Sequence, residues 1–253
     1  MTHDASRSEP RFLVGDLGQP GDEIALPAGE ARQLTRVLRL GIGDTIVVFD
    51  GRGHEFSARV AGIGRDSATA VLITPLDPAP EPVIPFTIAQ ALLKGPSMDD
   101  VVRDAVMIGA EGIEPVVTAH VAAKPPLAAR RAAVARWRRI AIASAKQARR
   151  AFVPAVSEPC TLAEWLGRER PGLTIICVEP SAGWQAASMR DLQGGPAPQA
   201  AALLIGPEGG WTREEIRAAA DAGAVPVTLG SLTLRADAVA LTAGALFRIL
   251  WEG

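Results

Sequence analysis

The hydrophobic residues of this chain follow two different periods. Between residues 11 and 74 they form short runs that alternate or carry β-branched side chains, at 12–14, 45–49, 56–60 and 68–74, and glycines separate the runs. Such runs predict the hairpins of a small β-rich unit. Within the same segment, apolar residues recur at helical spacing over residues 28–40, which predicts one helix.

Beyond residue 85, apolar runs alternate with helical patterns. Strands are predicted at 86–93, 113–118, 173–178, 203–205 and 225–229, and helices after residue 96, over 127–150, between the last two strands and over 236–251. Ser97 with Asp100, and Thr212 with Glu215, have the spacing of capping boxes. Strands that alternate with helices indicate an α/β domain with a mostly parallel, covered sheet.

A proline-rich segment separates the two patterns. Residues 75–85 read PLDPAPEPVIP, a density of proline that favours a stiff extended spacer. We therefore predict a small β-barrel domain over residues 1–74, a linker over 75–85 and an α/β domain over 86–253. The polar residues 1–10 are expected to be disordered.

Composition narrows the class of protein. The net charge is −2, no stretch has the length of a membrane span, and the two cysteines form no disulfide framework. We expect a soluble cytoplasmic protein that does not act at a membrane. Dinucleotide-binding, P-loop, zinc-protease and serine-hydrolase motifs are absent, and His3, His54 and His120 lie far apart, so no metal site is predicted.

Positive charge is concentrated in one segment. Between Glu114 and Glu158 there is no acidic residue, and the cations there are Lys124, Arg130, Arg131, Arg136, Arg138, Arg139, Lys146, Arg149 and Arg150. Most of them lie off the apolar stripe of the predicted helix over 127–150. This distribution favours a polyanionic partner, although a solvated helix face would have the same composition.

Two apolar runs near the C-terminus end directly in glycine. They are residues 203–206, LLIG, and 227–230, VTLG. An apolar run that breaks into glycine is typical of a buried strand leaving a sheet into a loop that passes close to another group. Two such exits predict the floor of a binding site.

The residues around these exits resemble a known family. IGPEGGWTREE at 205–215 and LGSLTLRADAVAL at 229–241 resemble the paired signatures of the SPOUT methyltransferases, and more narrowly the bacterial family that methylates N3 of a uridine in 16S ribosomal RNA. QALLKGPSMDDVVRDAVMIGAEGIEP and RWRRIAIASAKQARR are similar to the middle segments of that family. RQLTRVLRLGIGD and FDGRGHEF are similar to its small PUA-like RNA-binding barrel.

The resemblance implies a fold and a cofactor that the periodicity does not. The fold is a C-terminal α/β domain tied in a deep trefoil knot. The cofactor is S-adenosylmethionine (SAM), bound in the knot, and a homodimer shares the site. The substrate implied is 16S rRNA in assembled small-subunit particles.

Cofactor-binding residues follow from the matched motifs. An adenine and a cationic sulfonium need apolar walls and exposed backbone, which leucines and glycines supply. Glu208 could complement the sulfonium or only stabilise the helix N-terminus that follows. The predicted cofactor residues are Glu179, Pro180, Ile205, Gly206, Pro207, Glu208, Gly209, Gly210, Leu229, Gly230, Leu232, Leu234 and Ala238.

Three residues are candidates for the chemistry. Arg235 or Arg150 could stabilise the uracil oxyanion that develops when N3 loses its proton. Arg235 could instead only pair with Asp237. Asp237 could orient Arg235, act as a weak base or cap the last helix. The transfer needs no metal.

RNA contacts are predicted on both parts of the chain. Phosphate contacts position the RNA without reading its sequence. The arginines of the helix over 28–40 could equally be a solvated face. The candidates are Arg36, Arg39, Lys94, Arg136, Arg139, Lys146 and Arg149.

The middle segments depart from the family pattern. ATELG is AVMIG here, with Met107 in place of glutamate, and EQSGR is KQARR, which changes Lys146, Ala148 and Arg149. His120 stands near a usual arginine, and Ala238 replaces a threonine. The departures leave open a SPOUT enzyme with another RNA target, or a non-catalytic RNA-binding or ribosome-assembly protein on the same fold.

Overall fold

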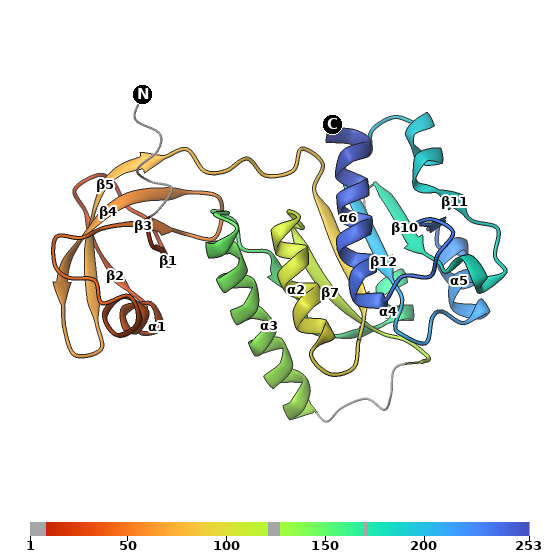
Figure 1. The fold of residues 1–253 in the computed structure, drawn as a ribbon, viewed down its shortest axis with the longest axis horizontal. Coiled ribbons are helices and arrows are strands. Elements are labelled where there is room, and N and C mark those ends of the chain that lie inside the picture. Colours follow the sequence, from red (N-terminus) through yellow and green to blue (C-terminus); the bar gives the residue numbers. More distant parts are fainter. Residues whose placement is uncertain (1–8, 121–126, 170–171, 253) are drawn as a thin grey trace. The chain divides into compact units, whose positions relative to one another are not determined.

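The computed structural model describes residues 9–120, 127–169 and 172–252 (Figure 1). They form two compact units, Met1–Glu81 with Ala145–Val153, and Pro82–Ser144 with Pro154–Gly253. Of the segment expected to be disordered, residues 1–8 lie outside the described residues, as do His3 and Lys124. Pro10 is described, and its carbonyl accepts a hydrogen bond of 2.9 Å from the Val47 N–H.

Unit 1 is built on a five-stranded sheet in the order β1-β3-β4-β5-β2. The strands are β1 (Arg11–Leu13), β2 (Glu23–Leu26), β3 (Thr45–Phe49), β4 (Glu55–Ile63) and β5 (Ala68–Leu76). All pairs are antiparallel except β1 with β3. The runs at 12–14, 45–49, 56–60 and 68–74 all fall in or overlap strands. β2 was not predicted, because it is a short edge strand with only Leu26 buried.

The helix of unit 1 is shorter and less regular than its pattern predicts. α1 (Ala28–Arg32) continues as a π-helical turn, η2 (Gln33–Val37), and ends before residue 40. Ala31 and Leu34 are buried against the sheet core, which includes Phe12 and Ile46. The apolar period therefore located the helix, but only part of its buried face: Ala31 and Leu34 are buried, whereas Val37 and Leu38, which have the same spacing, are exposed.

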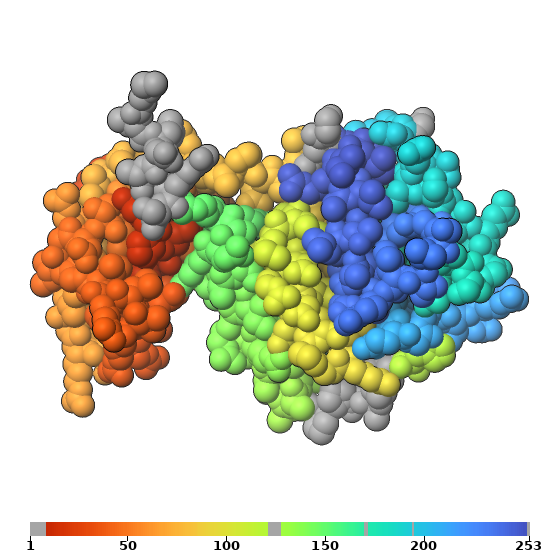
Figure 2. Space-filling view, viewed as in Figure 1, coloured from red at the N-terminus to blue at the C-terminus, as the bar shows by residue number. Residues whose placement is uncertain are grey.

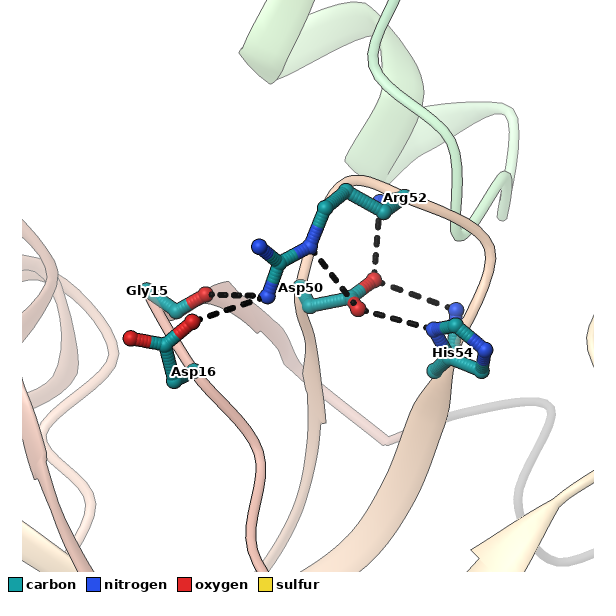
Figure 3. Close-up of polar contacts among 5 residues, drawn as sticks. All are labelled: Gly15, Asp16, Asp50, Arg52 and His54. Carbon is teal, nitrogen blue, oxygen red and sulfur yellow. Dashed lines mark hydrogen bonds and ion pairs between the residues drawn. The ribbon is translucent and has the colours of Figure 1, made fainter.

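The hairpin between β3 and β4 is held by a buried carboxylate (Figure 3). Asp50 accepts hydrogen bonds from the backbone N–H groups of Arg52 at 2.7 Å and His54 at 3.1 Å, and from the ring Nδ1 of His54 at 2.9 Å. The Arg52 guanidinium also reaches Asp16 at 2.9 Å. Burial alone would raise the pKa of Asp50, but these hydrogen bonds outweigh it and hold the pKa below its usual value.

Unit 2 contains an eight-stranded sheet in the order β11-β13-β10-β12-β6-β7-β8, with β9 also beside β7. Every strand pair in it is parallel, as the alternation of strands and helices predicts. The strands are β6 (Phe86–Ala91), β7 (Gly112–Val117), β8 (Ala155–Val156), β9 (Cys160–Thr161), β10 (Leu173–Cys177), β11 (Ala187–Ser188), β12 (Ala201–Ile205) and β13 (Val225–Thr228). β8, β9 and β11 have two residues each, too few to leave a hydrophobic period in the sequence.

The helices around this sheet are α2 (Ser97–Met107), α3 (Leu127–Gln147), α4 (Leu162–Leu166), α5 (Arg213–Asp221) and α6 (Ala236–Glu252). α6 lies against α2 (Figures 1 and 2), and its Phe247 ring packs on Phe86 of β6, with ring centroids 5.5 Å apart. None of the helices in the described ranges is long and apolar enough to cross a membrane.

The two predicted capping boxes have different outcomes. Thr212 caps α5 and exchanges hydrogen bonds with Glu215, so this capping box is confirmed. The one at Ser97 is wrong, since Pro96 is the N-cap of α2 and no side chain caps it. Ser97 lies inside the first turn, where its hydroxyl cannot reach the N–H group that an N-cap residue serves.

The last turn of α3 belongs to unit 1, whereas the sequence assigns all of residues 86–253 to one domain. Lys146 Nζ lies 2.6 and 2.5 Å from the carboxylate oxygens of Glu30 and 3.0 Å from Gln33 Oε1. The C=O of Ala151 accepts a hydrogen bond from the Gly53 N–H. These contacts join residues more than 90 positions apart, which no local pattern reveals.

Candidate functional site

A cavity of about 350 Å³ lies in unit 2 where β10, β12 and β13 end. The carboxyl ends of parallel strands are where open α/β sheets bind ligands. The predicted cofactor residues that line it are Glu179, Pro180, Ile205, Gly206, Pro207, Glu208, Gly210, Leu229, Leu232 and Leu234. The predicted residues Gly209, Gly230 and Ala238 are not among its lining residues.

Several lining residues were missed by sequence reasoning. They are Leu93, Ser97, Cys177, Val178, Trp211, Thr233, Ala236 and Val239. Trp211 and Cys177 could have been found, because one follows the glycine motif directly and the other ends a predicted strand. Burial raises the pKa of the Cys177 thiol to about 12, so it stays protonated and is no nucleophile at neutral pH.

The first glycine loop is shaped by close approach. A Cβ atom on Gly206 would lie 2.9 Å from Trp211 Nε1, and that indole N–H donates a 2.9 Å hydrogen bond to the Cys177 carbonyl. Gly210 has φ +68° and closes a turn onto the Pro207 carbonyl, with N···O 3.0 Å. A Cβ there would lie 3.1 Å from a carboxylate oxygen of Glu179. Both glycines therefore allow the loop to approach the end of β10.

Glu208 has a structural partner that the sequence did not reveal. Its Oε1 accepts a 2.8 Å hydrogen bond from the Lys94 backbone N–H. Lys94 lies in the loop after β6, and the carboxylate therefore joins this loop to the glycine loop after β12. Glu208 also lines the cavity.

A third loop, after β7, is held to the same region. The Ala119 N–H donates to Glu215 Oε1 at 2.8 Å, and His120 Nδ1 lies 3.0 Å from the Gly210 carbonyl. A carbonyl only accepts, so His120 carries a proton on Nδ1 in this contact. A Cβ on Gly209 would meet the His120 side chain at 3.2 Å. The histidine that departs from the family pattern thus supports the glycine loop.

Arg235 and Asp237 lie at the edge of the cavity. The guanidinium contacts the carboxylate twice, with Nε to Oδ1 at 3.1 Å and Nη2 to Oδ2 at 2.6 Å. Asp237 is in the first turn of α6, and the Arg235 carbonyl accepts the first N–H groups of that helix, from Ala238 and Val239. Asp237 therefore orients Arg235, and it is not the N-cap of the helix. The Arg235 side chain is 81% exposed and accessible to a ligand.

Arg150, the other arginine predicted to take part in the chemistry, does not belong to the unit that contains the cavity. It belongs to unit 1, where it is buried and its Nε lies 3.1 Å from both carboxylate oxygens of Glu81. Its guanidinium also lies over the Phe152 ring, 5.6 Å from the centroid. Arg150 does not line the cavity, and in this chain it forms an ion pair inside unit 1.

Several predicted RNA-binding cations already have protein partners. Lys146 is mostly buried against Glu30, so the charge reversal at this position is balanced inside unit 1. Arg136 on α3 pairs with Asp99 at the start of α2. Arg149 has φ +60° and is half-buried.

The remaining predicted cations are more exposed. Arg139 donates a hydrogen bond within α3, to the Ala135 carbonyl, and Lys94 lies in the loop beside the cavity. Arg36 pairs with Asp66 at 2.9 Å, with both side chains more than half exposed. Arg39, next to it in unit 1, is exposed too.

Two other departures from the family pattern are accommodated at the surface. Met107 is the last residue of α2, and its side chain is 40% exposed. Ala238 is exposed in the first turn of α6. Among the described residues, no group of three or more His, Cys, Asp or Glu side chains could hold a metal ion.

The comparison with protein families covers both units. The family model for an RNA methyltransferase domain matches residues 79–248, and that for an RNA methyltransferase PUA domain matches residues 26–73. The PUA match lies within unit 1, and most of the methyltransferase match lies in unit 2. The chain belongs to the RNA methyltransferase family.

Individual relatives support this assignment. "Ribosomal RNA small subunit methyltransferase E" of Synechocystis sp. is 31% identical over 235 residues, which are 90% of this chain and 74% of the relative. The protein of the same name from Mycobacterium bovis is 28% identical over 253 residues, 95% of this chain and 93% of the relative.

Solved structures resemble the whole chain. The Neisseria gonorrhoeae ribosomal RNA small subunit methyltransferase E bound to S-adenosyl methionine is 29% identical, covers 96% of this chain and 98% of its own, and has a TM-score of 0.87. A Legionella pneumophila protein described as a methyltransferase in complex with SAM is 26% identical, with coverages of 95% and 97% and a TM-score of 0.88.

Proposed function

We propose that this protein transfers the methyl group of SAM to N3 of a uridine in the 16S rRNA of the small ribosomal subunit. The observation that carries the proposal is the cavity between the two glycine loops, with the Arg235–Asp237 pair at its edge. Relatives over nearly the full chain are named as methyltransferases of small-subunit rRNA, and one of them was solved with SAM bound.

The cavity fits SAM by its chemistry. Leu229, Leu232 and Leu234 provide apolar surface, as an adenine ring requires, and the loops at 206–210 expose backbone. Among the residues that the structure describes, the charged ones that line the cavity are three carboxylates, Glu179, Glu208 and Asp237, and one guanidinium, that of Arg235. This balance favours a ligand with a cationic centre. The volume also lies within the range of about 300–1,000 Å³ that is usual for small-molecule sites.

Bound SAM supplies an electrophilic methyl group. The chain's own residues must then favour loss of the N3 proton from uridine to solvent, which leaves negative charge on the uracil oxygens. A guanidinium fixed beside these oxygens stabilises that charge, and Arg235 is both accessible and oriented by Asp237. Because both carboxylate oxygens of Asp237 already accept from Arg235, its role is to position the guanidinium, not to accept the proton.

We propose a homodimer as the active form. Leu232 in the loop beside the cavity is 79% exposed, and Leu241 and Ile249 of α6 are exposed in the same unit. Exposed large apolar side chains gain stability when a partner covers them. The trefoil knot implied by the resemblance stays a prediction. A sedimentation mass equal to one chain, 26.4 kDa, would contradict the dimer.

Methyl transfer tests the function directly. Purified protein, labelled SAM and small-subunit particles from cells that lack this methylation should give labelled 16S rRNA, with 3-methyluridine found by mass spectrometry. The variant Arg235→Ala should reduce the rate about 100-fold or more, as loss of one preorganised charge does. Arg217→Ala, which removes an exposed arginine of α5 away from the cavity lining, is the matched control.

The departures at Met107, His120 and Lys146 support a second candidate, the same chemistry on another RNA nucleotide. This candidate is favoured if mass spectrometry finds the methyl group at an atom other than N3 of a uridine. A protein that binds RNA but neither binds SAM in calorimetry nor transfers a methyl group would be a non-catalytic relative, and the proposed activity would then be wrong.

A further inference from the structure

A group of exposed residues at the end of the unit 1 helix combines apolar and cationic side chains. We call Arg36, Val37, Leu38, Arg39 and Ile42 the helix-end surface. Val37 is 71% and Ile42 68% exposed, and Leu38 is exposed as well, although Leu34 of the same helical segment is fully buried. A single exposed aliphatic residue is ordinary, but three within six positions mark a candidate interaction surface.

The backbone of this surface is irregular. The π-helical turn η2 ends at Val37, and the N–H groups of Leu38 and Leu40 bond back to the carbonyls of Gln33 and Leu34. Arg39 follows with φ +55°, a conformation that glycine adopts without strain and that arginine rarely adopts. A strained residue that carries a long cationic side chain suggests that the side chain is needed at this position.

The charge of the surface is positive. Residues 32–43 contain three arginines and no acidic residue. Arg36 pairs with Asp66 at 2.9 Å, but both side chains are more than half exposed, so a phosphate can replace the aspartate at little cost. Glu30, the acid that precedes the segment, is neutralised by Lys146. Asp44 borders the surface and accepts a 2.7 Å hydrogen bond from the Gly41 N–H, but Arg36 and Arg39 outnumber this carboxylate, so the surface complements a polyanion.

We propose that the helix-end surface binds an unpaired segment of the substrate RNA, with Arg36 and Arg39 on phosphates and Val37 and Ile42 against bases. The proposal rests on the proposed function. An A-form duplex presents phosphates, hydroxyls and a shallow minor groove, and gives aliphatic side chains no apolar face to cover. Unstacked bases present such faces, and proteins bind single strands by combining base contacts with a cationic track. Exposed aliphatics between arginines thus select unpaired RNA.

The first test replaces the aliphatics by threonine, a β-branched residue that is isosteric with valine and smaller than isoleucine. The double variant Val37→Thr with Ile42→Thr should weaken binding of a fluorescent 12-nucleotide single strand by roughly five-fold, since less apolar area is covered. Binding of the matching duplex should change less than about two-fold, and the salt dependence for the single strand should stay the same because no charge is removed. Val83→Thr, at another exposed valine outside unit 1, is the matched control.

Two outcomes of this test would overturn the proposal. The first is an unchanged affinity for the single strand, or an equal loss for single strand and duplex. The second is a change of sedimentation mass with unchanged RNA binding, which would make the surface a contact between copies of the chain. These assays need no SAM. A wild-type protein that binds single strands but transfers no methyl group would therefore refute the proposed function and leave this surface standing.

The second test separates the side chain of Arg39 from its backbone. Arg39→Gly should raise the melting temperature, because glycine relieves the strain at φ +55°. It should also weaken RNA binding and reduce the steepness of log affinity against log salt by about one unit, as expected for one lost phosphate contact. A merely structural Arg39 would give a stable variant with unchanged RNA binding and unchanged salt slope, and that result would remove Arg39 from the surface.

Discussion

Gly210 is the residue where the backbone and the cavity are most directly linked. Its φ is +68°, and a Cβ would lie 3.1 Å from a carboxylate oxygen of Glu179, a lining residue. Gly210→Ala should lower the free energy of unfolding by about 1–2 kcal/mol, the usual penalty for a side chain in the left-handed region. It should also displace Glu179 and weaken SAM binding about tenfold, which corresponds to about 1.4 kcal/mol.

Gly223→Ala is the matched control for this prediction. Gly223 follows α5 with φ +89°, and nothing lies within 4 Å of the Cβ that alanine would add. The two variants therefore share the backbone penalty, measured by urea unfolding, but only Gly210→Ala changes the cavity. Isothermal titration calorimetry with SAM should separate them. Equal SAM affinities for the two variants would refute the assignment of the cavity as the cofactor site.

Three further variants test the electrostatics. Asp50→Asn should lower the free energy of unfolding by about 2 kcal/mol at pH 7. This difference from wild type should shrink as the pH falls below about 4 and through the lowered pKa of Asp50, and urea unfolding at several pH values would detect the change. Burial raises the pKa of Asp104, and the negative charges of Asp100 and Asp237 raise it further, although Arg103 opposes them. The charged carboxylate therefore destabilises the fold, and Asp104→Asn should stabilise the protein by less than about 1 kcal/mol at pH 7. Below pH of about 4 the carboxyl is protonated in both states, and the substitution should have no effect. Lys146→Glu should destabilise unit 1 by about 2–4 kcal/mol, and adding Glu30→Lys should restore most of the loss, as a double-mutant cycle would measure.

Features set by near neighbours were predictable from the sequence. The capping box of Thr212 and Glu215 and the pairing of Arg235 with Asp237 join residues two or three positions apart. The parallel sheet followed from the alternation of strand and helix periods. Ser97 shows the limit of such rules, because its motif has the right spacing but Pro96 occupies the cap. The edge strand β2 and the two-residue strands leave too little period to be recognised.

The motifs also located most of the cavity, since a strand that ends in glycine must turn at the edge of a sheet. What they could not supply is which distant loops meet there. Glu208 and the Lys94 backbone are 114 positions apart, and His120 and Gly210 are 90 apart. Such pairs depend on the strand order, which places β12 between β6 and β10.

The cations show most clearly which properties follow from the sequence and which depend on the tertiary structure. The sequence by itself determined the amount of positive charge in residues 124–150 and its separation from acids nearby in the chain. Only the tertiary structure decided which charges remain available, because it brings Glu81 to Arg150 and Glu30 to Lys146 inside unit 1. Ion pairs act over a few ångströms regardless of separation along the chain, so charge patterning could indicate RNA binding but could not distinguish exposed cations, such as Arg39, from buried ones.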